Sequence, residues 1–368
     1  MSLAVTPEPQ NPTNGSEIEE IKMAFNKFDV VSDASDHHYF VDKHSTKKST
    51  GQDCFVNAAS SVYKKVIQEW RILERNLPES IFVRVYENRI DLLQAVIIGA
   101  AGTPYHDGLY FFDLAFPIDY PHRPPLVHYH SFGMRINPNL YENGRVCLSL
   151  LNTWSGKKCE KWNANESTVL QVLVSIQALV LNEKPYYNEP GVLSGRVKWD
   201  KKSMAYNENV FVLSCKTMLC LLRNPPKNFE DFVAGHFRER AEAIISACNA
   251  YMNGRAMVAY YRNDGGDGSS SLGKKKVYVS DKFKGLVDKL YPQLVAAFTK
   301  NGTPLSIFYD QAKVEIKAGS FNDNHPRVVV KKKGTIGILK RVFGRVKVFL
   351  GLNKKADQGS RNDVKKES

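Results

Sequence analysis

One cysteine in this chain, Cys147, is surrounded by a pattern of residues that could do acyl-transfer chemistry. It follows a Pro-containing turn, Asn137-Pro138-Asn139, and a second turn at Asn143-Gly144, and it opens an apolar run. A thiolate is a strong nucleophile and a good leaving group, so a cysteine can accept an acyl group and pass it on. Asn139 lies eight residues before Cys147, so a tight loop can bring an amide donor close to the sulfur. A lone cysteine is more often a small buried hydrophobic residue, so the interpretation depends on its surroundings.

These surroundings resemble the ubiquitin-conjugating enzyme family. In that family a His-Pro-Asn loop precedes the thioester-forming cysteine, and here Asn137 stands in place of the His. The other motifs occur in the family's order within roughly residues 58–225, namely Gly102-Thr103-Pro104-Tyr105, Gly108 to Phe112, Tyr120 to Pro125, and Trp162. The Asn-Pro-Asn variant is similar to the large plant and animal members, in which a conjugating domain lies among long flanking segments.

The resemblance implies a role for each site residue. Cys147 would carry ubiquitin as a thioester, and Asn139 would stabilise the oxyanion, hold the loop, or do both. Asn137 would support the loop, since an amide donates and accepts hydrogen bonds as the family's His does. Glu189, in the Pro-flanked segment 185–190, is the candidate for the acidic residue that orients the incoming lysine or lowers its pKa.

The implied partners are ubiquitin, the ubiquitin-activating enzyme, and protein substrates that accept ubiquitin on lysine. Lys64 and Lys65 match the basic positions of the family's first helix that receive the activating enzyme; the alternative is an ordinary solvated helix face. His122 and Asn163 stand where the family's ligase-docking surface carries apolar or small residues. Apolar anchors carry most interface energy, so we expect weak binding of common RING-type ligases. The large members also suggest ligase-like activity of the chain's own.

No cofactor is expected, because the chain has no Gly-rich phosphate loop and the activating enzyme would consume the ATP. The Asp36-His37-His38 cluster could supply metal ligands, but a docking segment that caps the following domain is the favoured interpretation. The alternative function is a non-catalytic scaffold that keeps the fold and binds ubiquitin or partner proteins. A hydrolase is disfavoured, because no nearby segment assigns a His to Cys147.

The hydrophobic pattern predicts the elements that position the loop. From Ser60 apolar residues recur at helical spacing until Pro78, which predicts an N-terminal helix. Four short apolar runs then predict an antiparallel meander, at residues 81–86, 92–98, 110–116 and 126–129. Helices are predicted after the cysteine at residues 169–181, 204–222 and 229–251. The expected fold is therefore α+β and UBC-like, with an N-terminal helix, a four-stranded antiparallel meander and C-terminal helices.

Composition predicts how the chain is divided. Residues 1–56 are expected to be largely disordered, 57–225 to form the conjugating core, and 226–262 a helical extension. Residues 263–276 read as a flexible linker, and 277–368 as a basic tail with a short helix. Residues 301–368 hold 15 basic and 6 acidic residues, so +9 of the net charge of +13 lies there. A solvated tail is the first interpretation; contact with a membrane or nucleic acid and a role in nuclear import or substrate capture are the alternatives.

The cysteines and apolar runs indicate a compartment. The six cysteines form no CxxC pair and no disulfide-framework spacing, which is typical of a reducing compartment. The longest apolar runs, residues 92–101 and 169–181, are shorter than the roughly 20 residues that span a bilayer. We therefore expect a cytoplasmic or nuclear location, or both.

Overall fold

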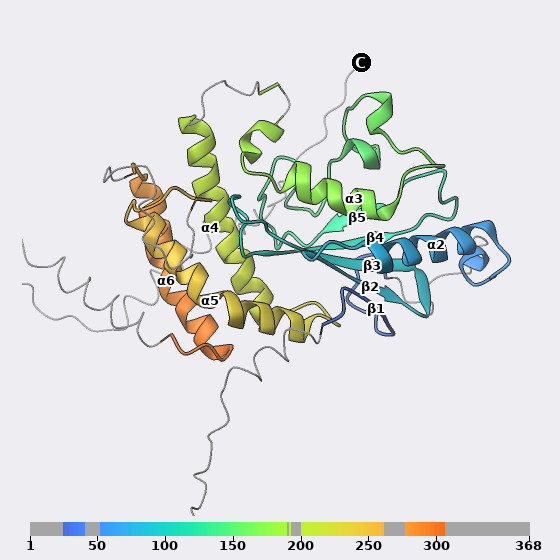
Figure 1. Cartoon of the computed structure of the whole chain (residues 1–368), viewed down its shortest axis with the longest axis horizontal. Helices are drawn as coiled ribbons and strands as arrows, with labels where there is room; N and C mark the ends of the chain where they lie inside the picture. The colour runs from blue at the N-terminus through green and yellow to red at the C-terminus, as the bar shows by residue number, and fades with distance from the viewer. Residues whose placement is uncertain (1–24, 41–51, 190, 193–199, 261–276, 306–368) are drawn as a thin grey trace, which may run out of the picture. The chain divides into compact units, whose positions relative to one another are not determined.

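The computed structural model describes residues 25–40, 52–189, 191–192, 200–260 and 277–305 (Figure 1). Its sheet consists of β1 (Phe28–Val31), β2 (Ile81–Tyr86), β3 (Arg89–Ile98), β4 (Leu109–Ala115) and β5 (Leu126–Tyr129). Its α-helices are α2 (Ser61–Asn76), α3 (Val169–Ser175), α4 (Lys201–Arg223), α5 (Glu230–Met252) and α6 (Asp281–Lys300). Short helical turns include η4 (Ile176–Val180), which continues α3, and η5 (Pro185–Asn188). None of the described helices is both long and apolar enough to span a membrane.

The five strands lie in sequence order across one sheet. β2, β3, β4 and β5 pair antiparallel, so the predicted meander and α+β fold are confirmed. β1 was not predicted: it adds to the sheet parallel to β2, with Phe28 opposite Val83 and Val31 opposite Tyr86. The expectation of a largely disordered segment before residue 57 is therefore wrong for this stretch. Its four residues are all half-buried or exposed, so they lack the alternation that marks a strand.

One face of the sheet packs against α2 and α3 and forms the main core. Helix α2 begins where Ser60 Oγ accepts a 3.0 Å hydrogen bond from the Tyr63 N–H, and it ends before Pro78. Its apolar stripe brings Val66 and Leu73 onto the sheet, where both are fully buried. Sheet residues with the opposite side-chain direction cannot reach this core, so they must be covered by other segments.

The second face is covered by residues 25–40 and by the start of α5. Phe25 and Phe232 pack on Phe82 of β2, and the Arg84 guanidinium lies 4.0 Å from the centre of the Phe25 ring. Aromatic rings attract the guanidinium, which keeps this buried charge partnered. The predicted docking role of residues 28–40 therefore agrees with their position on the sheet.

A histidine cluster fixes the same segment near β4 and β5. The His38 ring stacks on the His128 ring with centroids 3.4 Å apart, and the His38 N–H donates a 2.8 Å hydrogen bond to the buried Asp113 carboxylate. His130 Nε2 lies 2.8 Å from Asp113 Oδ2, which is an ion-pair distance. His37 Nε2 lies 3.0 Å from the Leu93 carbonyl oxygen. These contacts make the cluster a docking element.

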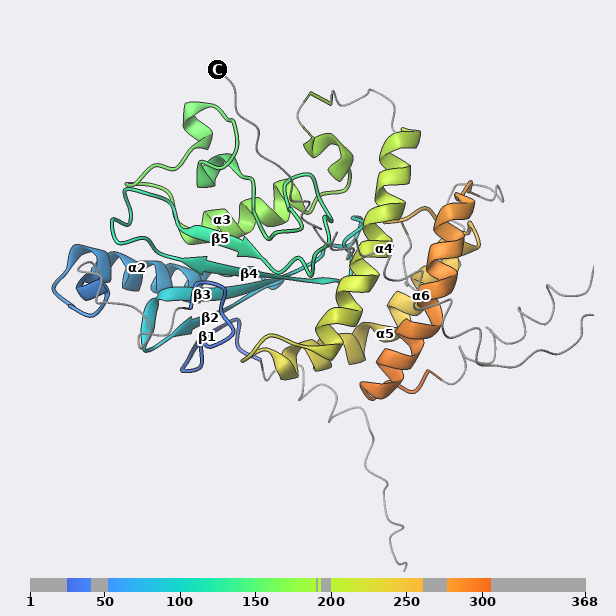
Figure 2. The ribbon, with the colours of Figure 1, turned by 180° about the vertical axis from the view of Figure 1, so that it is seen from behind.

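Helices α4, α5 and α6 group together at one end of the sheet (Figures 1 and 2). α4 is tied to β4 by a 2.9 Å hydrogen bond from the Tyr110 hydroxyl to Ser214 Oγ. α6 has 20 residues and packs against α4 and α5 with Leu294 and Phe298 fully buried. The helix predicted near the start of the basic segment 277–368 is α6, which is longer than expected and packs on the helices before it. The predicted linker at 263–276 and the tail beyond 305 lie outside the described residues.

Candidate active site

Cys147 closes a compact loop that begins at Asn137. Isolated bridges between Asn137 and Leu140, and between Leu140 and Val146, fold the loop back on itself. The Cys147 N–H donates a 2.9 Å hydrogen bond to the Asn139 carbonyl oxygen. Cys147 is only 1% exposed, so the sulfur must become accessible before it can react with another thioester.

The Asn139 side chain completes a reciprocal pair with Cys147. Its Nδ2 donates a 2.9 Å hydrogen bond to the Cys147 carbonyl oxygen, and the residue is buried. This contact holds the loop around the cysteine. An amide nitrogen carries two hydrogens, so the second N–H remains available for an oxyanion that forms beside the sulfur. The hydrogen bond ties the Asn139 side chain to the loop, and the oxyanion role stays a prediction.

Asn137 is fully buried and uses both ends of its amide. Nδ2 donates 2.7 Å hydrogen bonds to the Tyr105 hydroxyl and to the Val180 carbonyl oxygen. Oδ1 accepts a 2.8 Å hydrogen bond from the Asn139 N–H. Burial raises the pKa of Tyr105 well above its ordinary value, so its hydroxyl stays protonated and donates to the Ile136 carbonyl oxygen. A buried amide with all these partners stiffens the loop.

Two asparagines that sequence reasoning missed join this network from the loop after η4. Asn188 Nδ2 lies 3.4 Å from Asn137 Oδ1 and 3.1 Å from the Val180 carbonyl oxygen. Asn182 Nδ2 in turn donates a 2.7 Å hydrogen bond to Asn188 Oδ1. The amides therefore connect the segment 182–188 to the cysteine loop. The signal in the sequence is two asparagines flanking a Pro-Tyr-Tyr turn, but nothing in it indicates their contact with Asn137.

Glu189 lies beside the same loop and reaches it through Arg135. Its Oε2 is 3.9 Å from Arg135 Nη2, and both side chains are about half exposed, at 51% and 42%. Arg135 Nη2 also donates a 3.2 Å hydrogen bond to the Pro138 carbonyl oxygen, and its guanidinium lies 4.4 Å from the Tyr141 ring. An exposed pair of this kind adds little stability, so Glu189 is free to interact with an incoming group.

The two lysines of α2 have different surroundings. Lys64 is exposed on the solvent face of the helix. Lys65 lies 3.9 Å from Glu69, whose carboxylate is fully buried and accepts hydrogen bonds from the Tyr120 hydroxyl and the Val169 N–H. Burial raises the pKa of Glu69, and Lys65 opposes that rise. Lys65 therefore has a structural task as the nearest cation to a buried carboxylate.

His122 and Asn163 are both exposed, on two loops that the fold brings together. Trp162, which precedes Asn163, donates a 2.7 Å hydrogen bond from Nε1 to the carbonyl oxygen of Pro121, which precedes His122. Asn163 is further tied within its own loop, because Nδ2 donates to Glu166 Oε2 at 2.9 Å. These two polar residues therefore lie on one surface. The assignment of both to the family's ligase-docking surface requires this.

Among the described residues, the remaining cysteines and the histidines form no second reactive centre of comparable definition. Cys215 and Cys248 are buried on α4 and α5, and a hydrogen bond with Cys248 that stabilises the protonated thiol, together with burial, raises the pKa of Cys215. Within the described part of the chain, no three His, Cys, Asp or Glu side chains are placed to hold a metal ion.

Comparison with known proteins decides the family. The family model for ubiquitin-conjugating enzyme matches residues 65–213. Putative ubiquitin-conjugating enzyme E2 38 of Arabidopsis thaliana is 50% identical over 286 residues, which cover 77% of this chain and 84% of the relative. The chain belongs to the ubiquitin-conjugating enzyme family. This membership places Cys147, inside the matched region, in a fold whose members are transferases that form a thioester.

Other relatives of this ubiquitin-conjugating enzyme family member are much longer. Probable ubiquitin-conjugating enzyme E2 25 of Arabidopsis thaliana is 59% identical over 62% of this chain, but the match covers only 37% of that relative. The human dual E2 ubiquitin-conjugating enzyme/E3 ubiquitin-protein ligase BIRC6 is 37% identical over 66% of this chain and 5% of its own length. The chain therefore spans well under two thirds of several relatives.

Proposed function

We propose that this chain accepts ubiquitin from the activating enzyme as a thioester on Cys147 and transfers it to lysine side chains of substrates. The observation that carries the proposal is the reciprocal pair of hydrogen bonds between Asn139 and Cys147, in a chain that belongs to this family. The pair fixes the backbone on both sides of the nucleophile and keeps an amide donor next to it.

Charging is a thioester exchange. The Cys147 thiolate attacks the ubiquitin thioester on the activating enzyme, a new C–S bond forms, and the activating enzyme's thiolate leaves. The exchange needs no general base beyond what generates the thiolate. Lys64, exposed on α2, is the basic residue best placed to contact the activating enzyme.

Transfer needs more from the protein. The lysine amine attacks the thioester carbonyl, a C–N bond forms, the C–S bond breaks, and the amine gives up a proton to solvent or to a nearby base. Negative charge develops on the carbonyl oxygen, where a fixed N–H donor contributes about 10²–10³ in rate in comparable acyl transfers. The second N–H of Asn139 is our candidate for that donor. Glu189, exposed beside Arg135, is the candidate for orienting the amine.

The Asn-Pro-Asn form of the motif fits this proposal because Asn137 makes the supporting hydrogen bonds itself. The polar, exposed His122 and Asn163 further favour transfer with little help from common RING-type ligases. The printed name of BIRC6 gives that relative both conjugating and ligase roles. We extend the proposal to ligase-like activity of this chain on its substrates.

A pulse–chase experiment tests transfer directly. The chain is charged with ubiquitin, the activating enzyme is then inhibited, and free lysine or a lysine peptide is added. We expect the reductant-sensitive adduct to disappear as an isopeptide product accumulates. An adduct that forms but never passes to any amine would favour the alternative, a scaffold that holds ubiquitin without conjugating it.

A further inference from the structure

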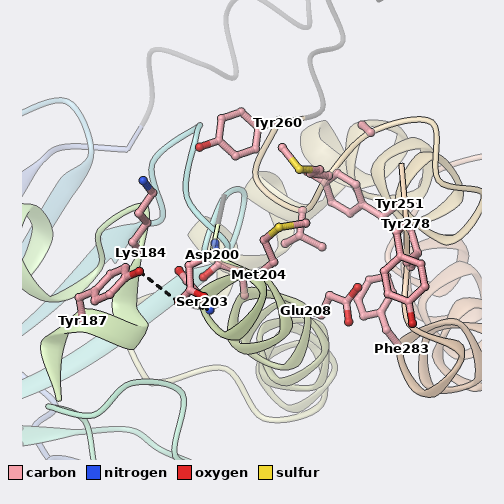
Figure 3. A pocket seen from close by; sticks show the side chains of 15 residues that line it. Lys184, Tyr187, Asp200, Ser203, Met204, Glu208, Tyr251, Tyr260, Tyr278 and Phe283 are labelled. Atoms are coloured by element: carbon pink, nitrogen blue, oxygen red, sulfur yellow. Dashed lines mark hydrogen bonds between the residues drawn. The ribbon is translucent and has the colours of Figure 1, made fainter. Parts of the chain in front are cut away.

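A cavity separates the segment beside the cysteine loop from the helices at the end of the sheet (Figure 3). One wall consists of Lys184, Tyr187 and the first half of α4, and the other consists of lining residues within 251–260 and 278–283. Its volume is about 40 Å³, and a single water needs about 10–15 Å³, so it holds about three waters or the ammonium end of a lysine side chain. The family model ends at residue 213, so the second wall lies beyond the shared conjugating core.

The charge of the lining is negative. Asp200 and Glu208 both line the cavity, and Lys184 is the single basic side chain among the described lining residues. Asp200 accepts hydrogen bonds from the Lys202 N–H and from the Tyr187 hydroxyl, and these contacts hold its pKa below the usual value. Glu208 accepts hydrogen bonds from the Ser280 N–H at 3.2 Å and from Ser280 Oγ at 2.5 Å. Both acids are therefore fixed in place in a lining that contains one lysine.

A buried acceptor also lines the cavity. Asn207 is 7% exposed, and its Nδ2 donates a 2.9 Å hydrogen bond to the Glu183 carbonyl oxygen. Its Oδ1 is buried and has no hydrogen-bond partner in the part of the chain that the structure describes. A buried carbonyl oxygen without a donor is unfavourable, so a group rich in N–H donors would be favoured beside it.

Aromatic and thioether side chains supply the remaining surface. Tyr278, at the mouth, is 83% exposed, and Tyr260 is 41% exposed and donates its hydroxyl hydrogen to Glu183. Met204 and Phe283 add apolar surface inside (Figure 3). Aromatic faces attract cations, and apolar surface accommodates an alkyl chain. Carboxylates, a buried acceptor and aromatic rings together match an alkylammonium group.

We infer that this cavity binds a lysine side chain of the acceptor protein, near the lysine that receives ubiquitin. This inference rests on the proposed conjugating function. The position of the cavity favours an acceptor protein as the source of the bound lysine side chain. Lys184 and Tyr187, which line the cavity, belong to the same segment as Asn188, and Asn188 contacts Asn137 of the cysteine loop. A basic side chain held here would orient the acceptor toward Cys147.

Methionine-methyl NMR on the full chain tests binding without any thioester chemistry. The probe is Nα-acetyl-lysine amide, compared with the norleucine analogue, which keeps the alkyl chain and lacks the ammonium. We expect the lysine probe to shift the methyl signals of Met204 and Met257, which line the cavity, and to leave Met134 and Met218 unchanged. Norleucine should produce much smaller shifts.

A charge-removing variant tests the recognition. Glu208→Gln removes the charge but keeps an oxygen for Ser280, so we expect folding to persist and affinity for the lysine probe to fall about tenfold. Glu242→Gln, an exposed glutamate on α5 outside the cavity, is the matched control and should bind as the wild type does. Unchanged affinity in Glu208→Gln would overturn the inference, as would equal shifts with norleucine or no shift at Met204 and Met257.

The chain's own lysines are the competing source. Lys274, Lys275 and Lys276 precede Val277 in the sequence, close to the cavity residue Tyr278. Binding of the probe only after all three are changed to Ser would assign the cavity to this segment and overturn the acceptor role. A chain that binds the lysine probe but never forms a thioester would instead defeat the proposed conjugating function, so the two failures are distinguishable.

Discussion

Asn139 and Cys147 hold each other through two hydrogen bonds of 2.9 Å, one from the Cys147 N–H to the Asn139 carbonyl and one from Asn139 Nδ2 to the Cys147 carbonyl. The backbone bond does not depend on the side chain of Asn139. Removal of that side chain therefore leaves one of the two hydrogen bonds between the loop and the cysteine. It also removes the only amide that we propose as a donor to the oxyanion.

We predict that Asn139→Ala leaves charging of Cys147 within about threefold of the wild-type rate and slows transfer to lysine by about 10²-fold or more. The reason is that thioester exchange has a good leaving group on both sides, whereas attack by an amine depends more on oxyanion stabilisation. Single-turnover charging and discharge, measured separately, check this. Asn143→Ala, at an exposed position in the same loop, is the control. Equal loss of both steps would show that Asn139 acts only through the structure of the loop.

Asn188 is predicted to position the cysteine loop for transfer. Asn188→Ala removes its contacts with Asn137 and with the Val180 carbonyl, and we expect discharge to lysine to slow by about tenfold, as for the loss of one hydrogen bond in a buried network. Asn188→Asp should behave similarly, because it keeps the shape and loses the donor. Discharge rates check this, with the exposed Asn165→Ala as the control. Normal discharge in both Asn188 variants would remove the residue from the mechanism.

The two lysines of α2 should separate a binding role from a structural one. Lys64→Glu should slow charging about fivefold at low salt with no change in melting temperature, because it reverses an exposed charge that we propose contacts the activating enzyme. Lys65→Glu should lower the melting temperature by about 2–4 °C or more, because it places a like charge beside the buried Glu69. Charging kinetics and thermal unfolding of both variants distinguish the two. Identical effects would contradict the assignment.

The histidine cluster should make stability depend on pH. Burial, together with the neighbouring His38 and His130, lowers the pKa of His128 to about 4, and burial lowers the pKa of His37. In the unfolded chain the histidines have ordinary pKa values near 6.5, so the unfolded chain binds more protons than the folded chain between about pH 4 and 6.5. The contribution of these histidines to the free energy of unfolding is therefore fully present above about pH 6.5 and is lost as the pH falls toward 4.

We expect the melting temperature to fall between pH 7.5 and pH 5, and to fall by about 2–4 °C less in His128→Gln, after discounting for the partial exposure of His128. The pKa of Asp113 does not interfere, because the His130 contact outweighs burial and lowers it to about 2, below this range. His122→Gln, at an exposed position, is the control and should match the wild type at both values of pH. An equal fall in His128→Gln and the wild type would contradict this account.

The ligase surface gives a prediction about partners. Because His122 and Asn163 are polar and exposed, common RING-type ligases should stimulate discharge by less than about twofold. His122→Phe supplies an apolar anchor and should increase the stimulation by at least one ligase. Discharge assays with a panel of unrelated ligases check this. Strong stimulation of the wild type by several of them would show that the polar residues do not block docking.

The sequence could predict elements with a strong pattern and residues with a motif. The stripe of α2, the alternation in β2 and the apolar run of β3 identified these elements, and the spacing of Asn139 and Cys147 identified the loop. β1 escaped prediction because its four residues are not buried on alternate sides, and because its pairing with β2 joins positions about 55 apart in the chain, Phe28 and Val83.

The other residues of the site could not be predicted for a related reason. Asn188 is an ordinary polar residue until the fold places its amide against Asn137, 51 residues away. Lys65 likewise reads as a solvated helix residue until Glu69 is seen to be buried by Tyr120 and the start of α3. Contacts between side chains distant in sequence carry no local signal, so only the three-dimensional structure reveals them.

Charging of Cys147 tests the central claim most directly. The chain is mixed with ubiquitin, activating enzyme and ATP, and the products are separated with and without reductant, for the wild type and for Cys147→Ser. We predict a wild-type adduct that reductant removes, and a Cys147→Ser adduct that survives reductant because an oxygen ester replaces the thioester. If the folded wild type forms no adduct while another conjugating enzyme charges in parallel, or if a reductant-sensitive adduct persists in Cys147→Ser, then Cys147 does not carry ubiquitin and the account is contradicted.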